Sequence, residues 1–148
     1  MGTRATVKFF EQYGPESVCI CSVYHQYDGD LAWVGYDLAY LLQNRKIING
    51  FGLGMDMSQY ANGLGCLAAQ YVAKVKTELG NVYMTSPDNT QNYDYRIEAR
   101  LVEDKEDLHI TVHHFETLLF QGGVTDFLRA CARARDGIDY NDKGVDLE

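Results

Sequence analysis

Residues 47–79 constrain the fold most strongly, because a glycine-rich stretch there leads directly into the most periodic helical pattern of the chain. Apolar side chains recur with the i, i+3, i+4, i+7 spacing of one helix face, namely at Leu64, Leu67, Ala68, Tyr71, Val72, Val75 and Leu79. We expect a core helix that begins near Gly63 and stops at Gly80, since glycine suits the left-handed position after a helix. Five of the fourteen glycines lie just before or within its start: Gly50, Gly52, Gly54, Gly63 and Gly65.

This glycine-rich stretch has two interpretations, which the sequence leaves open. Backbone N–H groups and the positive end of the helix dipole can hold an anion at a helix N-terminus. The stretch can equally be a tight connection whose positive φ angles only glycine adopts cheaply. Residues 50–54 match neither the dinucleotide-binding fingerprint nor a Walker motif, because no Gly-Lys-Ser/Thr sequence follows.

The remaining patterns predict one α+β domain over residues 1–135. Alternation of apolar and polar residues predicts strands, and 3.6-residue periodicity predicts two further helices. Gly35 lies in the middle of one of them, where glycine weakens a helix, so we expect this helix to pack closely against a neighbouring element there. The order ββααβββα indicates an antiparallel sheet of about five strands with helices packed on one face. The expected strands are 4–11, 17–26, 82–85, 93–101 and 108–113, and the expected helices besides the central one are 31–43 and 124–135.

Charge and cysteine usage narrow the class of protein. The formal net charge is −8, about half of it from an acidic tail, residues 136–148, which we expect to be flexible. A chain with no basic stripe is unsuited to broad nucleic acid binding, although a small phosphorylated ligand needs only one local positive site. No apolar run reaches the length of a membrane span, so we expect no membrane partner. Cys19 and Cys21 are two apart on a predicted strand, so we expect them to point to the same face in parallel, where they cannot bridge comfortably. This favours a reducing cytoplasm.

The residues that carry acid, base or metal chemistry do not form an enzymatic pattern. His109 and His113 are four residues apart on one strand, roughly 13 Å, which is too far to share a metal ion. No zinc-binding spacing of cysteine and histidine is present, so we expect neither a metal nor another cofactor. Cys66, near a helix start, is the one candidate nucleophile, although its apolar neighbours favour burial.

Positive and aromatic side chains supply the candidate ligand-binding residues. Arg129 and Arg133 lie four apart on the helix face opposite Phe127 and Leu128, and this spacing suits phosphate or an acidic partner as well as a merely solvated face. Tyrosines beside predicted turns can stack on a nucleobase or on a partner. The candidate ligand-binding set is Gly50, Gly52, Gly54, Asn62, Gly63, Gly65, Arg129, Arg133, Tyr27 and Tyr93.

Several runs of the chain resemble a family of small, mostly uncharacterised proteins of bacteriophages and prophages. The resemblance covers about the first hundred residues and is carried by residues 1–5, 24–29, 35, 38–39, 49–50, 61–70 and 93–95. Where similar proteins commonly have Asp-Gly-Tyr-Pro, this chain has Asp28-Gly29-Asp30-Leu31. The resemblance implies a phage or prophage setting, in which small proteins often act on host machinery or on host defence signals, and it implies no catalytic residues.

Three functions follow as hypotheses. The first is a non-enzymatic binding protein, acting as a homo-oligomer in the host cytoplasm, that binds or sequesters a small anionic ligand such as a nucleotide. The second is an inhibitor or adaptor that engages a host protein through its acidic surface. The third is a small hydrolase that uses Cys66 or a histidine.

Overall fold

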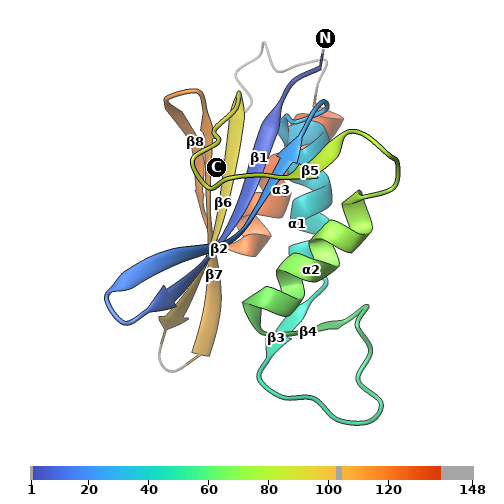
Figure 1. Ribbon diagram of the computed structural model, residues 1–148, viewed down its shortest axis with the longest axis vertical. Coiled ribbons are helices and arrows are strands. Elements are labelled where there is room, and N and C mark those ends of the chain that lie inside the picture. Colours follow the sequence, from blue (N-terminus) through green and yellow to red (C-terminus); the bar gives the residue numbers. More distant parts are fainter. Residues whose placement is uncertain (1, 103–104, 138–148) are drawn as a thin grey trace.

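The computed structural model describes residues 2–102 and 105–137, in which one face of a six-stranded sheet is covered by helices (Figure 1). This arrangement confirms the predicted α+β class. The elements in chain order are β1 Ala5–Tyr13, β2 Glu16–His25, a π-helix η1 Leu31–Gly35, α1 Tyr36–Gln43, β3 Lys46–Ile48, β4 Tyr60–Asn62, α2 Gly63–Val75, β5 Val82–Met84, β6 Tyr93–Val102, β7 Lys105–His114, β8 Thr117–Gly122 and α3 Val124–Asp136.

The sheet is mixed, so the prediction of an antiparallel sheet of about five strands was wrong. Its order is β5-β2-β1-β6-β7-β8, and β1 runs parallel to β6 while every other neighbouring pair is antiparallel. The chain thus forms two antiparallel halves that meet at one parallel junction. β5 pairs with β2 rather than with β6, and β8 was not expected. A second, two-stranded sheet of β3 and β4 was also missed.

Alternate side chains of the strands form the core under the helices, as the alternation predicted. Val7 and Phe9 of β1 and Tyr95 and Ile97 of β6 are fully buried. Phe127 and Cys131 of α3 are buried against them, and Leu67 and Tyr71 of α2 are buried as well.

Gly35 provides the close approach that the sequence predicted. A Cβ atom at this position would lie 3.1 Å from Cys131 Sγ and 3.2 Å from Tyr95 Oη. The hydroxyl of Tyr95 is fixed, because it donates to the backbone oxygen of Gly29 at 2.7 Å. Glycine therefore lets the junction of η1 and α1 pack directly on α3 and β6.

The central helix α2 is shorter than predicted. It ends at Val75, and Leu79 is almost fully exposed instead of facing the core. The physical reason is Lys76, whose backbone turns extended at ψ 90°. Its Nζ donates to the backbone oxygens of Leu79, Gly80 and Val82. These bonds stabilise a loop where the apolar pattern alone continues the helix.

A bulge in β2 also overturns the expectation that Cys19 and Cys21 share a face. The register shifts between Phe9 and Phe10, so that Cys21 pairs with Phe9 and Cys19 pairs with Phe10. The extra residue turns Cys21 toward the helices, where it packs on the core, and leaves Cys19 on the opposite face.

The predicted tail can be placed only at its beginning. Helix α3 includes Asp136 and is followed by Gly137, one residue beyond the predicted boundary. The rest of the tail, residues 138–148, lies outside the described residues. Among the helices that are described, none has the length and apolar character needed to cross a membrane.

Candidate ligand-binding pocket

A pocket of about 270 Å³ lies where the end of β2, the π-helix η1 and the C-terminal half of α2 converge. The loops on either side of it connect β2 to η1 and α2 to β5. Of the elements that line it, α2 lies on the helix side of the sheet, and β2 and β5 form one edge of the sheet (Figure 1). A cavity of this size, just below the range of about 300–1,000 Å³ of small-molecule sites, has room for at most one small ligand.

His25 and Tyr71 form the inner wall of this pocket. Nε2 of His25 lies 2.8 Å from the Tyr71 hydroxyl, and both side chains are buried. Burial lowers the pKa of His25 to about 4 and raises the pKa of Tyr71 well above its ordinary value. Both groups are therefore neutral at pH 7, and the hydrogen bond between them makes this wall uncharged.

Two partly exposed aromatic side chains also line the pocket. Trp33, on η1, is 44% exposed, and Tyr27, in the loop after β2, is 39% exposed. The guanidinium carbon of Arg135 lies 5.0 Å from the Trp33 ring centroid, so a cation of α3 lies over one face of that ring. The Tyr27 hydroxyl donates to the Glu78 carboxylate, which fixes the second ring. Aromatic surface that is both accessible and held in position suits stacking on a flat ligand.

The charged side chains that line the pocket are acidic in excess. Asp28 and Asp37 carry formal negative charges, whereas Lys74 is the one basic residue among the lining residues. Lys74 Nζ lies 5.4 Å from the Tyr40 ring centroid, which draws it toward that ring. Hydrogen-bond donors on a ligand would find acceptors here, while a multiply charged anion would meet repulsion.

The backbone around the pocket departs from regular geometry. Three non-glycine residues among those described have positive φ, and two of them, Asp28 at 59° and Asn81 at 70°, line this pocket. Asp and Asn adopt this conformation more readily than other residues, so the strain is modest. Trp33 and Val34 belong to the π-helix, in which the Gly35 N–H donates to the Asp30 oxygen five residues earlier at 3.2 Å. Short π-helices and left-handed residues gather at functional sites more often than elsewhere.

The predicted glycine-rich residues occupy a separate region from this pocket. Gly50, Gly52 and Gly54 lie in the loop between β3 and β4, and Gly63 and Gly65 lie in the first turn of α2. Gly50 and Gly54 have positive φ, at 92° and 86°, and Gly63 has φ 84°. The Asn62 side-chain oxygen accepts the Gly50 N–H at 2.7 Å, so it closes the loop on itself. Glycine adopts these positive φ angles at little cost.

The other predicted residues are spread over the molecule. Arg129 lies on the exposed face of α3, where NH1 contacts Asp126 Oδ1 at 2.7 Å. Arg133 lies one turn further on the same helix. Tyr93, at the start of β6, stacks on His114 with 4.5 Å between ring centroids. Of the predicted set, only Tyr27 lines the pocket described above.

The hydrolase hypothesis finds little geometric support. Cys66 is half-buried on α2, and its sulfur lies 3.6 Å from the Gln70 side-chain nitrogen rather than beside a histidine. Within the described part of the chain, no group of three or more His, Cys, Asp and Glu residues is arranged to hold a metal ion.

Sequence reasoning missed most of the pocket and a second polar site. His25, Trp33, Asp37 and Lys74 were not singled out, although the turn signals Asp28-Gly29 and Gly80-Asn81 and the single tryptophan of the chain mark this region.

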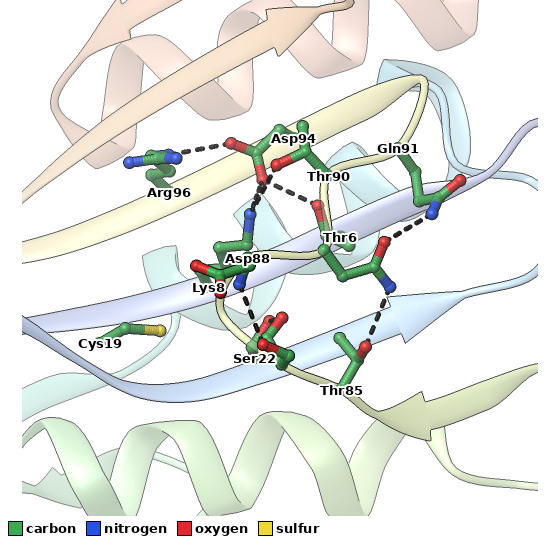
Figure 2. A network of polar contacts seen from close by, with 12 residues as sticks. Thr6, Lys8, Cys19, Ser22, Thr85, Asp88, Thr90, Gln91, Asp94 and Arg96 are labelled. Carbon is green, nitrogen blue, oxygen red and sulfur yellow. Dashed lines mark hydrogen bonds and ion pairs between the residues drawn. The ribbon is translucent and has the colours of Figure 1, made fainter.

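The second site is a buried polar network on the sheet face away from the helices (Figure 2). Lys8 Nζ contacts Asp94 Oδ1 at 2.8 Å, and Thr6 and Arg96 donate to the same carboxylate. Burial opposes ionisation of Asp94, but the hydrogen bonds from Lys8, Arg96 and Thr6 prevail and lower its pKa. Residues 85–91 cover this network through hydrogen bonds among Thr85, Asn89 and Gln91. The carboxylate of Asp94 and the ammonium of Lys8 therefore have protein partners, and the network connects β1 to β6.

Comparison of this chain with protein-family models, with curated proteins and with solved structures gives no match.

Proposed function

We propose that this protein is a non-enzymatic binding protein that takes up a small ligand of the nucleoside class in the pocket between β2, η1 and α2. The observation that carries the proposal is the combination of two partly exposed aromatic rings with an uncharged inner wall in one cavity of about 270 Å³. A nucleobase is a flat ring that stacks on such side chains. Its amino groups, and the hydroxyl groups of the sugar, are donors for which Asp28 and Asp37 offer acceptors.

The charge of the lining residues refines the predicted ligand. A nucleotide was expected from the glycine-rich segment and the arginines, which lie apart from this pocket. The pocket offers one lysine against two aspartates, so each phosphate added to the ligand costs electrostatic free energy. The ligand that fits best is an uncharged nucleoside, and a nucleoside monophosphate should bind more weakly.

The biological role consistent with this site is sequestration. The residues around the pocket supply no activated nucleophile, since the pKa of His25 is about 4 and its neighbour Tyr71 stays protonated. In the phage or prophage setting that the resemblance implies, a protein that binds such a ligand without altering it would lower its free concentration in the host cytoplasm.

Isothermal titration calorimetry with the four common ribonucleosides and their 5′-monophosphates tests the proposal. We expect at least one nucleoside to bind, its monophosphate to bind more weakly, and Trp33→Ala to weaken binding by at least about tenfold through the loss of stacking. Phe51→Ala is the matched control, because Phe51 is an exposed aromatic residue outside the pocket. Failure of every nucleoside to bind, or binding that survives Trp33→Ala unchanged, would contradict the proposal.

A pair of charge variants tests the preference for an uncharged ligand. Asp37→Asn should narrow the difference in affinity between nucleoside and monophosphate, and Lys74→Gln should widen it. Asp126→Asn, an exposed aspartate on α3, should leave the difference unchanged. Mass spectrometry of the ligand after prolonged incubation should recover it intact, and a converted product would show that the protein is an enzyme.

A further inference from the structure

The loop between β3 and β4 carries an apolar surface that the ligand-binding proposal does not use. It projects beyond α2, away from the sheet (Figure 1). Phe51 is 73% exposed, Met57 is 63% exposed, Met55 is 46% exposed, and Leu53 is fully exposed. Four large apolar side chains in seven consecutive residues are unusual on a protein surface and indicate an interaction site.

A hollow of about 180 Å³ lies directly beside this loop. Its walls are predominantly apolar and include Ile48, Phe51, Met55, Met57 and Cys66. Leu53 does not line the hollow and projects into solvent next to it. A cavity of about 150 Å³ accommodates benzene, so this hollow has room for a leucine side chain.

A projection and a hollow on the same surface are self-complementary. In a two-fold symmetric dimer, a residue of one copy contacts a site on the second copy, and the reverse contact forms by symmetry. We propose that a second copy of this chain docks here, with Leu53 of each copy entering the hollow of the other.

The available surface and its charge are consistent with this occupant. Side chains of this size expose on the order of 100 Å² each, so the four offer about 400 Å², or half of the about 800 Å² per partner of a standard interface. The walls of the hollow and the loop backbone supply more. The charges at the loop are Lys46, Asp56 and Arg45, whose guanidinium donates to the Ser58 backbone oxygen at 2.8 Å. The patch therefore carries a formal charge of only +1, and two copies of it repel each other weakly.

The net charge of −8 distinguishes a second copy from other occupants. Two acidic copies repel each other through charges outside the patch, and added salt screens this repulsion. The dimer dissociation constant should therefore fall or stay unchanged as salt is added. A basic host protein would bind less tightly as salt is added. An anionic membrane would repel the acidic chain at low salt.

Sedimentation equilibrium of the full chain at low and high salt tests the proposal. We expect a monomer–dimer equilibrium that salt does not weaken, and we expect Leu53→Ser to raise the dimer dissociation constant by at least about tenfold. Leu79→Ser is the matched control, because Leu79 is an almost fully exposed leucine outside the patch. Both leucines are exposed, so both variants should keep the unfolding midpoint of the wild type.

The outcomes that overturn the proposal are specific. A wild-type protein that remains monomeric up to its solubility limit would show that the patch does not pair with itself. A dimer that Leu53→Ser leaves intact would place the interface elsewhere. Nucleoside binding in the Leu53→Ser monomer would leave the proposed ligand function standing, because the pocket and the patch share no lining residue.

Discussion

Lys8 and Asp94 form a buried ion pair, 2.8 Å from Nζ to Oδ1, across the single parallel junction of the six-stranded sheet. The side chains are 0% and 4% exposed. Thr6 and Arg96 complete the carboxylate's partners, and Thr90 accepts from Lys8 at 3.3 Å. The pair therefore links the two antiparallel halves of the sheet on the face that no helix covers.

Removal of one member of this pair should destabilise the protein strongly. Asp94→Asn leaves the Lys8 ammonium buried without its counter-charge, which costs roughly 3–5 kcal/mol in comparable sites. The free energy of unfolding from urea titration measures the loss. Glu98→Gln in the partly exposed pair with Arg100 is the control and should cost less than about 1 kcal/mol. Equal losses of unfolding free energy in the two variants would mean that the buried pair contributes no more to stability than the partly exposed pair.

His25 should make stability fall in mildly acidic solution. Its pKa is about 4 in the folded protein and about 6.5 when unfolded, so in this interval the unfolded chain binds the proton and the folded chain does not. The free energy of unfolding should therefore decrease as pH falls from about 6.5 to about 4, by up to about 3 kcal/mol.

Urea unfolding of His25→Gln at pH 7 and pH 5 isolates this contribution. The variant should lose a large part of the pH dependence in the interval and keep the part due to His109, whose pKa burial also lowers, whereas His113→Gln, at a half-exposed position of β7, should retain the contribution of His25. If His25→Gln kept the full pH dependence, another group would be responsible.

Leu67, on α2, and Leu79, beyond its end, differ in burial, so their replacement by alanine should lower the free energy of unfolding by different amounts. Leu67 is fully buried, and Leu67→Ala should lower the free energy of unfolding by about 2–5 kcal/mol. Leu79 is almost fully exposed beyond the helix end, and Leu79→Ala should change stability by less than about 0.5 kcal/mol. A large loss at Leu79 would restore the longer helix that the apolar periodicity predicted.

The two arginines first considered for anion binding should be dispensable for the ligand. Arg129→Ala together with Arg133→Ala should change the nucleoside dissociation constant by less than about twofold, because neither side chain lines the pocket. Calorimetry on the double variant measures this directly. A loss of binding in a variant that unfolds like the wild type would move the site to α3.

The sequence predicted local structure better than long-range pairing. Alternation fixed the faces of Val7, Phe9, Tyr95 and Ile97, because burial of one sheet face requires a period of two. The parallel contact between β1 and β6 joins residues about ninety positions apart, and no local pattern specifies such a contact. The helix end at Val75 depends on hydrogen bonds from Lys76, which periodicity does not register.

The candidate site was harder to predict for the same reason. The pocket assembles side chains from three segments, with His25 from β2, Trp33 from η1 and Lys74 from α2, and only Tyr27 had been selected. Asp28-Gly29 and Gly80-Asn81 are residue pairs typical of turns, but the closeness of the two loops depends on hydrogen bonds between Gln26 and Asn81. The burial of Lys8 was equally hidden, since its partner Asp94 lies on the strand across the parallel junction.

The single tryptophan of the chain allows the most direct test of the ligand-binding account. In a ¹H–¹⁵N spectrum, the indole N–H of Trp33 gives one resolved signal from a side chain that lines the pocket. Titration with the tightest-binding nucleoside should shift this signal in a saturable manner, together with backbone signals of residues 25–37 and 71–82. An unshifted indole signal under conditions where calorimetry reports binding, or shifts confined to α3 or to the β3–β4 loop, would contradict the account.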